Sequence, residues 1–413
     1  MKIAIIGSGI AGLGAAWLLS REHDVVIYEK EARLGGHTHT HRVQQAGREY
    51  AIDSGFIVHN PSNYPLLTRL LDELGVASQP TLMGFSVQNE RSGLEYNASN
   101  LNAMFCQRRN LLSPKFLRMV REILRFYREC GALLLETGDG PTLGTYLHDN
   151  NYSPMFIEDH LIPMASALWS SSSPTILEFP AKYLVRFMAN HHMLQVDQRP
   201  EWRVVSGGSS SYIAAMEQRW KLTTRLSSPV RAIRRDVDGV VVQTTAGVDR
   251  FDQIVLACHS DQALALLTDA NSAEREILGA IAYQENETVL HTDARLLPKR
   301  RKAWAAWNAF VPAALGANCT VSYCMNILQS LTSPEPFVVT LNRSADIDAS
   351  KILARMRYQH PVYTHASVAA QARRDEINGV NRTWYAGAYW GFGFHEDGLR
   401  SGVEVARALG VRW

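Results

Sequence analysis

The sequence lacks any long uninterrupted apolar segment. Across its 413 residues no apolar run approaches the roughly 18 residues that a membrane-spanning helix needs, so any membrane contact is expected to be peripheral. Cysteine is scarce as well, and five irregularly spaced thiols exclude a disulfide framework and favour a reducing cytoplasm. Neither sign of charge dominates: 42 basic and 40 acidic residues leave a net charge of +2. Because the basic residues are dispersed, we expect no nucleic-acid partner.

The sequence also lacks the residue patterns of metal sites and of nucleophilic hydrolases. His191 and His192 have no further Cys, His or acid nearby to complete a metal pattern, so no metal is expected. The serines at 209–211 follow a glycine pair but lack the strand-to-helix elbow that an acyl-transfer nucleophile requires. Metal-dependent chemistry and nucleophilic hydrolysis are therefore both unsupported.

The opening of the chain is its most informative part. Lys2 to Ile6 form a short apolar run, the sequence Gly-Ser-Gly-Ile-Ala-Gly follows at 7–12, and an apolar stretch continues from Leu13 to Leu19. This order predicts a strand, a tight glycine turn and a helix, with a second strand from Val25 to Tyr28. The chain is long enough for two to three domains around a large core.

The glycines of this turn indicate a dinucleotide site. Gly7 permits the turn, Gly9 lets backbone N–H groups approach a pyrophosphate, and Gly12 allows the helix to pack closely on the strand. The positive end of the helix dipole then faces the phosphates. Glu29 follows Gly9 by 20 positions, the expected spacing to a carboxylate that binds a ribose.

Further along, the pattern divides the chain. A strand with a glycine break is predicted over 51–58 and a helix over 64–74, whereas 81–202 reads as an inserted, mainly helical region with amphipathic stretches at 114–135 and 176–194. Strand signals return at 204–205, 229–233, 237–244 and 251–257, a mixed region spans 286–374, and a final strand at 382–387 precedes a helix over 396–409.

Several blocks, taken in order, carry a family resemblance. They are 7–12 with Glu29, Arg33-Leu34-Gly35-Gly36-His37, Asp53-Ser54-Gly55-Phe56, 230–233, 252–257, and Ala386-Gly387 through Ser401-Gly402. In these the chain resembles the flavin-dependent amine oxidase superfamily, which includes monoamine and polyamine oxidases, phytoene desaturases and protoporphyrinogen oxidase. The resemblance implies an α/β fold: a Rossmann-like FAD-binding domain of 1–80, 203–285 and 375–413, interleaved with a mixed α+β substrate domain of 81–202 and 286–374.

The same resemblance implies the cofactor and its contacts. FAD is expected, held non-covalently, with Glu29 at the adenosine ribose, Arg33 and Gly36 at the diphosphate, the Val230 backbone at the adenine, and Gly55 and Phe56 near the isoalloxazine. The full set of expected cofactor-binding residues is Gly7, Gly9, Ile10, Ala11, Gly12, Glu29, Lys30, Arg33, Gly35, Gly36, His37, Thr38, Gly55, Phe56, Ile57, Val230, Ala257, Gly387, Ala388, Asp397, Gly398 and Leu399.

The terminal helix is expected to supply part of the chemistry. Its N-terminal N–H groups, near Asp397-Gly398-Leu399, would point at the flavin N1 and C2 carbonyl and stabilise negative charge on the reduced ring. The alternative is that this helix simply covers the sheet.

A finer resemblance points to a bacterial subgroup of FAD-binding proteins discussed alongside cyclopropane-fatty-acid-synthase-like methyltransferases and linked to furan fatty acids. The segments that carry it are 36–40, 199–202, 206–209, 290–293 and 393–398. It implies desaturation of a methylated fatty acyl chain.

The chain departs from the amine oxidase pattern at two places. Where many relatives carry a lysine beside flavin N5, this chain has His291, which is either an acid–base group or structural. Where many relatives have an acid after Ala-Gly, this chain has Ala388, and Glu396 or Asp397 is the expected replacement.

The expected catalytic residues are His291, Phe394 and His395. Trp169, Tyr389, Trp390 and Phe392 are expected to line an apolar substrate channel, with a core role as the alternative.

The leading functional prediction is an FAD-dependent oxidoreductase that removes a hydride from an apolar small-molecule or lipid substrate, with an unspecified electron acceptor. Amine oxidation is the alternative within the fold, and a flavin-binding partner without turnover in a lipid-modifying complex is the alternative outside it.

Two groups of basic residues could contact a membrane. The arginines at 118, 121, 125 and 128 share one face of the helix expected over 116–128, and Lys299 to Lys302 lie beside Trp304 and Trp307. Either group could contact the inner face of a membrane or simply be solvated.

Overall fold

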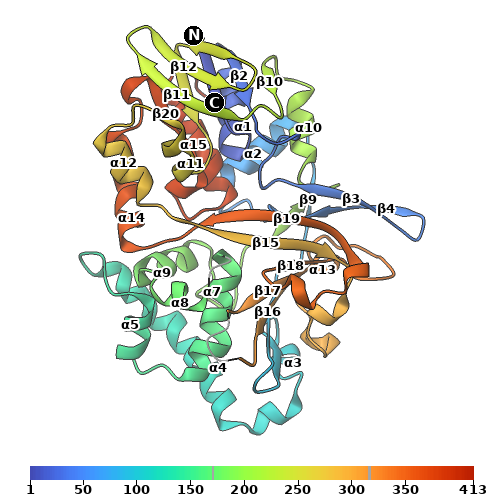
Figure 1. Ribbon diagram of the computed structural model, residues 1–413. Coiled ribbons are helices and arrows are strands. Elements are labelled where there is room, and N and C mark those ends of the chain that lie inside the picture. Colours follow the sequence, from blue (N-terminus) through green and yellow to red (C-terminus); the bar gives the residue numbers. More distant parts are fainter. Residues whose placement is uncertain (170–171, 315–317) are drawn as a thin grey trace.

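A parallel five-stranded sheet at one end of the molecule is assembled from separate segments of the chain (Figure 1). The computed structural model describes residues 1–169, 172–314 and 318–413. The strands in spatial order are β10 (Thr223–Arg225), β2 (Asp24–Tyr28), β1 (Lys2–Ile6), β14 (Gln253–Leu256) and β20 (Thr383–Tyr385). Ile3, Ala4 and Ile5 of the central strand are completely buried, as expected for a parallel strand covered on both faces.

One face of this sheet is covered by α1 (Ile10–Leu19), α2 (Pro65–Leu74) and α15 (His395–Ala408). The helices α1 and α15 pack closely because each has a glycine at the contact: a β-carbon at Gly402 would overlap the backbone carbonyl oxygen of Ala11, and one at Gly14 would overlap the Leu399 side chain. The N-termini of both helices consequently lie at the same edge of the sheet. The predicted strand–turn–helix at the start of the chain and the predicted terminal helix are confirmed.

The opposite face carries a small antiparallel sheet and three helices, which share one core cluster with the parallel sheet. These elements are β11 (Val230–Asp236), β12 (Gly239–Thr244), β13 (Val248–Phe251), α11 (Ser260–Leu266), α12 (Ser272–Gly279) and α14 (His365–Ala372).

A second, seven-stranded sheet crosses the middle of the molecule (Figure 1). Its order is β19 (Ile352–Pro361), β15 (Tyr283–His291), β18 (Val338–Leu341), β17 (Thr320–Cys324), β16 (Trp307–Val311), β7 (Phe85–Asn89) and β8 (Leu94–Asn97). The boundary expected between residues 285 and 286 falls inside β15, so this strand runs from one predicted domain into the other.

Two small sheets and two short helices make up the remaining connections. They are β3 (Thr40–Gln45) paired with β4 (Arg48–Asp53), the three-stranded set β5 (Val58–His59), β9 (Arg203–Val205) and β6 (Ser78–Pro80), and the helices α10 (Ser211–Glu217) and α13 (Met325–Leu328). The glycine break predicted within 51–58 separates β4 from β5.

Helices lie over one side of the seven-stranded sheet and surround their own apolar core. They are α3 (Leu101–Met104), α4 (Pro114–Glu129), α5 (Leu143–Asp149), α6 (Pro154–Phe156), α7 (Ile162–Trp169), α8 (Ser173–Leu177) and α9 (Ala181–Asn190). The helix predicted over 114–135 forms as α4 followed by a 3-10 turn at Cys130–Leu135. The single stretch predicted over 176–194 is wrong in detail, because Pro180 separates α8 from α9. The segment 81–202 also contributes β7 and β8, which the sequence pattern did not reveal.

Candidate active site

Two cavities meet between the parallel sheet and the seven-stranded sheet. The first has a volume of about 940 Å³ and the second about 790 Å³, both within the range of cofactor and ligand sites. Residues common to both linings mark where the two cavities join: His37, Tyr358, His360, Pro361, Gly393, Phe394 and His395. We call this set the junction.

The first cavity opens on the glycine turn after β1. A β-carbon at Gly7 would lie 2.8 Å from the carbonyl oxygen of Ala257, whereas one at Gly9 would have no atom within 4 Å. Gly9 therefore presents bare backbone to the cavity, beside the N-terminus of α1. This is the cradle that a pyrophosphate requires, so the residues present fit a dinucleotide.

Glu29 stands at the end of β2 and is almost fully buried. One of its carboxylate oxygens accepts hydrogen bonds from the backbone N–H and hydroxyl of Ser8, at 2.9 and 2.6 Å, and the other accepts from the N–H of Glu31 at 2.9 Å. The side chain is thus held rigidly at the cavity wall, where a ribose hydroxyl could donate to it.

Arg33 organises the loop that follows. Its guanidinium donates to the carbonyl oxygens of Leu34, Gly36 and Thr38 at 2.8–3.2 Å, while the residue still lines the first cavity. The arginine therefore fixes the backbone of the glycine pair and leaves positive charge facing the cavity.

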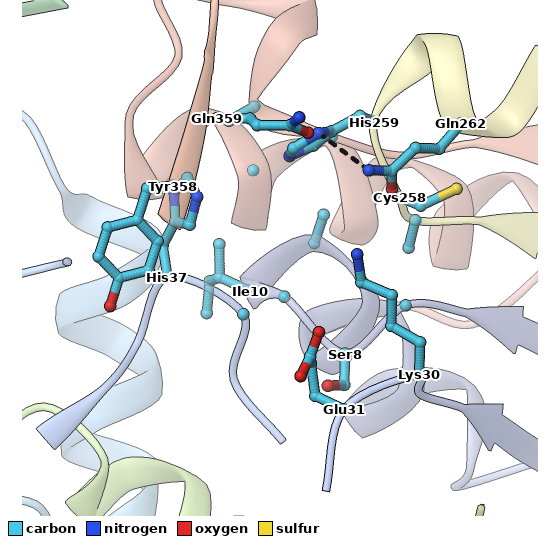
Figure 2. A pocket seen from close by; sticks show the side chains of 18 of the residues that line it. Ser8, Ile10, Lys30, Glu31, His37, Cys258, His259, Gln262, Tyr358 and Gln359 are labelled. Atoms are coloured by element: carbon cyan, nitrogen blue, oxygen red, sulfur yellow. Dashed lines mark hydrogen bonds between the residues drawn. The ribbon is translucent and has the colours of Figure 1, made fainter. Parts of the chain in front are cut away.

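Figure 2 shows the first cavity from close by. On one side lie Lys30, Glu31 and Ser8, and across from them lie His259 and Gln262. A hydrogen-bond contact of 3.4 Å joins the Gln262 side-chain amide to Nδ1 of His259. His37 and Tyr358 are at the end of this view that leads toward the second cavity.

The structure brings most of the expected cofactor-binding residues to the first cavity. Those that line it are Gly7, Gly9, Ile10, Ala11, Glu29, Lys30, Arg33, Gly35, Gly36, His37, Val230, Ala257, Gly387, Ala388 and Gly398. Gly55, Phe56 and Ile57 line the second cavity instead.

Four other expected cofactor-binding residues line neither cavity among the described residues. Gly12 supports the turn, since a β-carbon there would overlap the carbonyl oxygen of Gly7, and Leu399 packs on Gly14 of α1. The buried hydroxyl of Thr38 bonds to Tyr212 at 2.6 Å. Asp397 is the fourth.

The carboxylates of Asp397 and Glu396 accept hydrogen bonds from backbone N–H groups at the starts of helices. One oxygen of Asp397 accepts from the N–H groups of Phe392 and Phe394, which closes the start of α15. The two oxygens of Glu396 accept from the N–H groups of Leu66 and Leu67 at the first turn of α2. Neither carboxylate lines a cavity in the described part of the chain, so the expected replacement for the missing acid is not found there.

His395 and Phe394 occupy the junction. The His395 ring stacks on Phe56 with centroids 3.7 Å apart, and its Nε2 lies 3.0 Å from the hydroxyl of Tyr212. Burial lowers the pKa of His395 to about 3, and the imidazole is therefore neutral at physiological pH.

Sequence reasoning missed Tyr358 and His360, which reach the junction from β19. The Tyr358 hydroxyl bonds to Ser54 at 2.8 Å, and the Asn286 side-chain amide donates to Nδ1 of His360 at 2.9 Å. His360 therefore carries its proton on Nε2, and burial together with His259 lowers its pKa to about 4. The alternation of apolar and basic residues at 354–357 (Ala-Arg-Met-Arg) was the available signal, but it predicts only a strand.

Aromatic rings line the inner part of the second cavity. Phe394 stacks against Phe187 at 4.8 Å, Trp169 lies edge-on to Phe187 at 4.9 Å, and Phe392 lies 5.5 Å from the same ring. Trp169 and Phe392, which the sequence suggested as channel residues, both line this cavity.

Three other expected site residues lie elsewhere. Tyr389 lines the first cavity, and Trp390 contacts Tyr389 and Arg374 without lining either cavity within the described residues. His291 is fully buried at the end of β15, away from both cavities as described. Its Nδ1 accepts from the Asp293 N–H and its Nε2 lies 2.8 Å from the Thr340 hydroxyl, so both ring nitrogens have structural partners.

The described residues contain neither a metal-binding cluster nor a membrane-spanning helix. No cluster of three or more His, Cys, Asp or Glu side chains in that part of the chain could hold a metal ion. Among the helices that the structure describes, none is both long enough and apolar enough to cross a bilayer.

Comparison with known proteins adds family information. The model of the flavin containing amine oxidoreductase family matches residues 10–295. No curated protein sequence matches the chain.

Solved structures share the fold across nearly the whole chain. Cyclohexylamine oxidase from Brevibacterium oxydans IH-35A is 17% identical with a TM-score of 0.71, and a CLA-producing fatty acid isomerase from P. acnes is 16% identical with a TM-score of 0.67; each match covers 99% of this chain and 98% of the other. A putrescine oxidase bound to putrescine is 14% identical, with a TM-score of 0.69 and 99% of both chains covered.

Proposed function

We propose that this chain, which belongs to the flavin-containing amine oxidoreductase family, desaturates an apolar fatty acyl substrate, in particular a methylated one. The protein is an FAD-dependent oxidoreductase, and its first cavity has the residues that FAD needs. The second cavity is the place for the substrate, because it joins the first at the junction.

The lining of the second cavity is the observation that carries this proposal. Leu, Ile, Val, Met and aromatic side chains make up most of it, with several histidines and a few Ser, Thr and Asn side chains among them, and Glu201 is the single acidic residue among those described in the lining. The Glu201 carboxylate already pairs with Arg203 at 2.5 Å. A cationic polyamine would therefore find no unpaired carboxylate there, whereas an acyl chain would exchange water for apolar contacts along its length.

One solved relative supports an acyl substrate. The fatty acid isomerase has the same fold at 16% identity, so this architecture accommodates a fatty acid in at least one other protein.

Removal of two hydrogens from adjacent carbons requires a hydride acceptor and a proton acceptor. FAD, when bound, supplies the first by taking a hydride from the substrate carbon. For the second, the junction offers the side chains of His37 and His395; burial lowers the pKa of both, so the rings are neutral but only weakly basic. Phe394 lines both cavities beside them.

Anaerobic flavin reduction tests this proposal. Purified yellow holoprotein is mixed without oxygen with methyl-branched acyl phospholipids, the corresponding free acids, and polyamines, and the visible flavin absorbance is followed. We expect bleaching by an acyl substrate only. Bleaching by polyamines alone would refute the desaturase proposal, and absence of bleaching by every compound would favour a flavin-binding partner without turnover.

Oxidation of a neutral amine is the second candidate. The stacked pair Phe394 and Phe187 provides aromatic faces at the inner end of the second cavity, and two solved relatives are named as amine oxidases. A small apolar amine such as cyclohexylamine therefore belongs in the same anaerobic panel.

A further inference from the structure

The opening of the second cavity is bordered by large apolar side chains that face solvent. Four residues line this cavity and are nevertheless substantially exposed, which places them at its mouth: Leu82 is 75% exposed, Leu101 77%, Val196 64% and Leu124 45%. We call these four residues the rim. They come from the loop after β6, from α3, from the segment after α9, and from α4. Figure 1 shows α3 and α4 at the end of the molecule opposite the parallel sheet.

The exposed face of α4 continues the rim. Leu117, Arg121, Leu124 and Arg128 are spaced by four, three and four residues, so they form one stripe along the helix, and each is exposed. Alternation of leucine and arginine on an outward face is typical of helices that lie in a membrane interface.

The arginines of this stripe differ from the others on α4. Arg118 and Arg125 are tied to Glu122 and Glu129 by ion pairs one helical turn away. Arg121 and Arg128 have no ion-pair partner in the part of the chain that the structure describes. Their charge is therefore available to an external anion.

Arg199 adds a third cation at the mouth. It lines the second cavity, and its Nε donates to the Gln195 carbonyl at 2.9 Å. Asp197 places one carboxylate in the same segment, and Glu201 is neutralised by Arg203. The charge around the rim is therefore net positive.

We propose that the rim and the α4 stripe dock on the surface of an anionic phospholipid bilayer. Leu82, Leu101, Leu124 and Val196 would insert among the acyl chains, while Arg121, Arg128 and Arg199 contact lipid phosphates. The cavity mouth would then face the hydrocarbon region, and an acyl chain could pass into the second cavity without crossing water. A bilayer fits better than a folded protein partner, because a partner seated on the rim would close the cavity mouth.

Vesicle flotation of the purified holoprotein tests docking without any turnover. The vesicles contain phosphatidylcholine alone or phosphatidylcholine and phosphatidylglycerol in equal parts. We expect binding to the anionic vesicles, weakened by salt. Replacing both Leu82→Ser and Leu101→Ser should lower the partition coefficient by roughly tenfold or more, since two large apolar side chains lose their insertion. Replacing both Arg121→Gln and Arg128→Gln should lower it by roughly 25-fold, at about fivefold per phosphate contact.

Matched controls separate docking from general surface effects. Leu135 and Val237 are 87% and 88% exposed but do not line the cavity, so Leu135→Ser with Val237→Ser should leave the partition coefficient unchanged. Arg231→Gln with Arg412→Gln, which removes two exposed arginines elsewhere, serves the same purpose for charge. Flavin absorbance and the thermal midpoint verify that each variant is folded.

Three results would overturn the docking proposal: equal binding to neutral and anionic vesicles, equal losses in rim and control variants, or no binding to any vesicle. A dimer seen by light scattering and lost in the Leu82→Ser, Leu101→Ser variant would also overturn it, by identifying the rim as an interface between copies. None of these outcomes depends on which substrate reduces the flavin, so this proposal and the proposed function can fail separately.

Discussion

His395 lies flat against Phe56, with ring centroids 3.7 Å apart and planes 7° from parallel. His395 is the first residue of α15 and Phe56 belongs to the loop between β4 and β5, so the stack fixes the start of the terminal helix against the wall of the second cavity. The Tyr212 hydroxyl, 3.0 Å from Nε2 of His395, fixes the ring from the side.

Phe56→Leu should lower the rate of flavin reduction by substrate roughly tenfold, because a displaced His395 would no longer hold its geometry at the junction. Stopped-flow absorbance measures the rate, and the flavin content shows whether FAD is retained. Phe310→Leu, which alters a buried ring outside both described linings, is the control and should react at the parental rate.

Glu29→Gln should weaken FAD binding by about 10- to 100-fold. The amide lacks the charge and one acceptor oxygen, while the N–H and hydroxyl of Ser8 still need an acceptor. Equilibrium dialysis with flavin fluorescence measures the affinity. Glu49→Gln, on the exposed β3–β4 hairpin, removes the same charge far from the cavity. Equal affinities for the two variants would contradict the role given to Glu29.

Gly402→Ala should lower the free energy of unfolding by about 1–3 kcal/mol, because the new methyl group would overlap the carbonyl oxygen of Ala11 and push α15 from α1. Urea denaturation gives the value. At Gly131 a β-carbon meets no atom within 4 Å, so Gly131→Ala should change stability by less than about 0.5 kcal/mol. A tolerated Gly402→Ala would mean that the two helices are not in such close contact.

His291→Gln should lower the unfolding free energy by about 1–3 kcal/mol and leave the flavin reduction rate within about twofold of the parent, because among the described residues the ring bonds to Thr340 and the Asp293 backbone and lines neither cavity. A large loss of rate in a stably folded variant would restore the catalytic role that the sequence suggested.

The stability of the protein should decline as the pH falls from about 6.5 toward 4. Burial lowers the pKa of several histidines, to about 4 for His59, His291 and His360 and to about 3 for His160 and His395. Each ring takes up a proton on unfolding within this window, so its contribution is complete above pH 6.5 and lost as the pH approaches the folded-state pKa. His291→Gln should reduce the slope by up to about 1.4 kcal/mol per pH unit. An unchanged slope would contradict the low pKa of His291.

Local sequence predicted the cofactor end of the site well. The glycine turn at 7–12 and the acid at 29 specify their roles within about 30 residues, because a strand, a turn and a helix place them regardless of the rest of the chain. The terminal helix was predictable for the same reason, although its tight contact with α1 through Gly402 was not.

The substrate end depends on long-range pairing that the sequence does not reveal. Tyr358 and His360 reach the junction only because β19 pairs with β15 in one register, opposite Asn286 and Gln284. His291 lies an odd number of positions from Thr288 in β15, so its side chain is on the other face of the strand and is buried in the protein interior. Thr288, three residues earlier in the same strand, lines the second cavity instead.

Analysis of the lipid product tests whether the protein desaturates an acyl chain. Holoprotein is reduced anaerobically by a methyl-branched acyl phospholipid, the lipid is extracted, and its mass is compared with the amount of flavin reduced. We expect one product molecule, lighter by two hydrogens and carrying a new carbon–carbon double bond, for each flavin reduced. Unchanged lipid beside flavin that only amines can reduce, with aldehyde as the product, would contradict it.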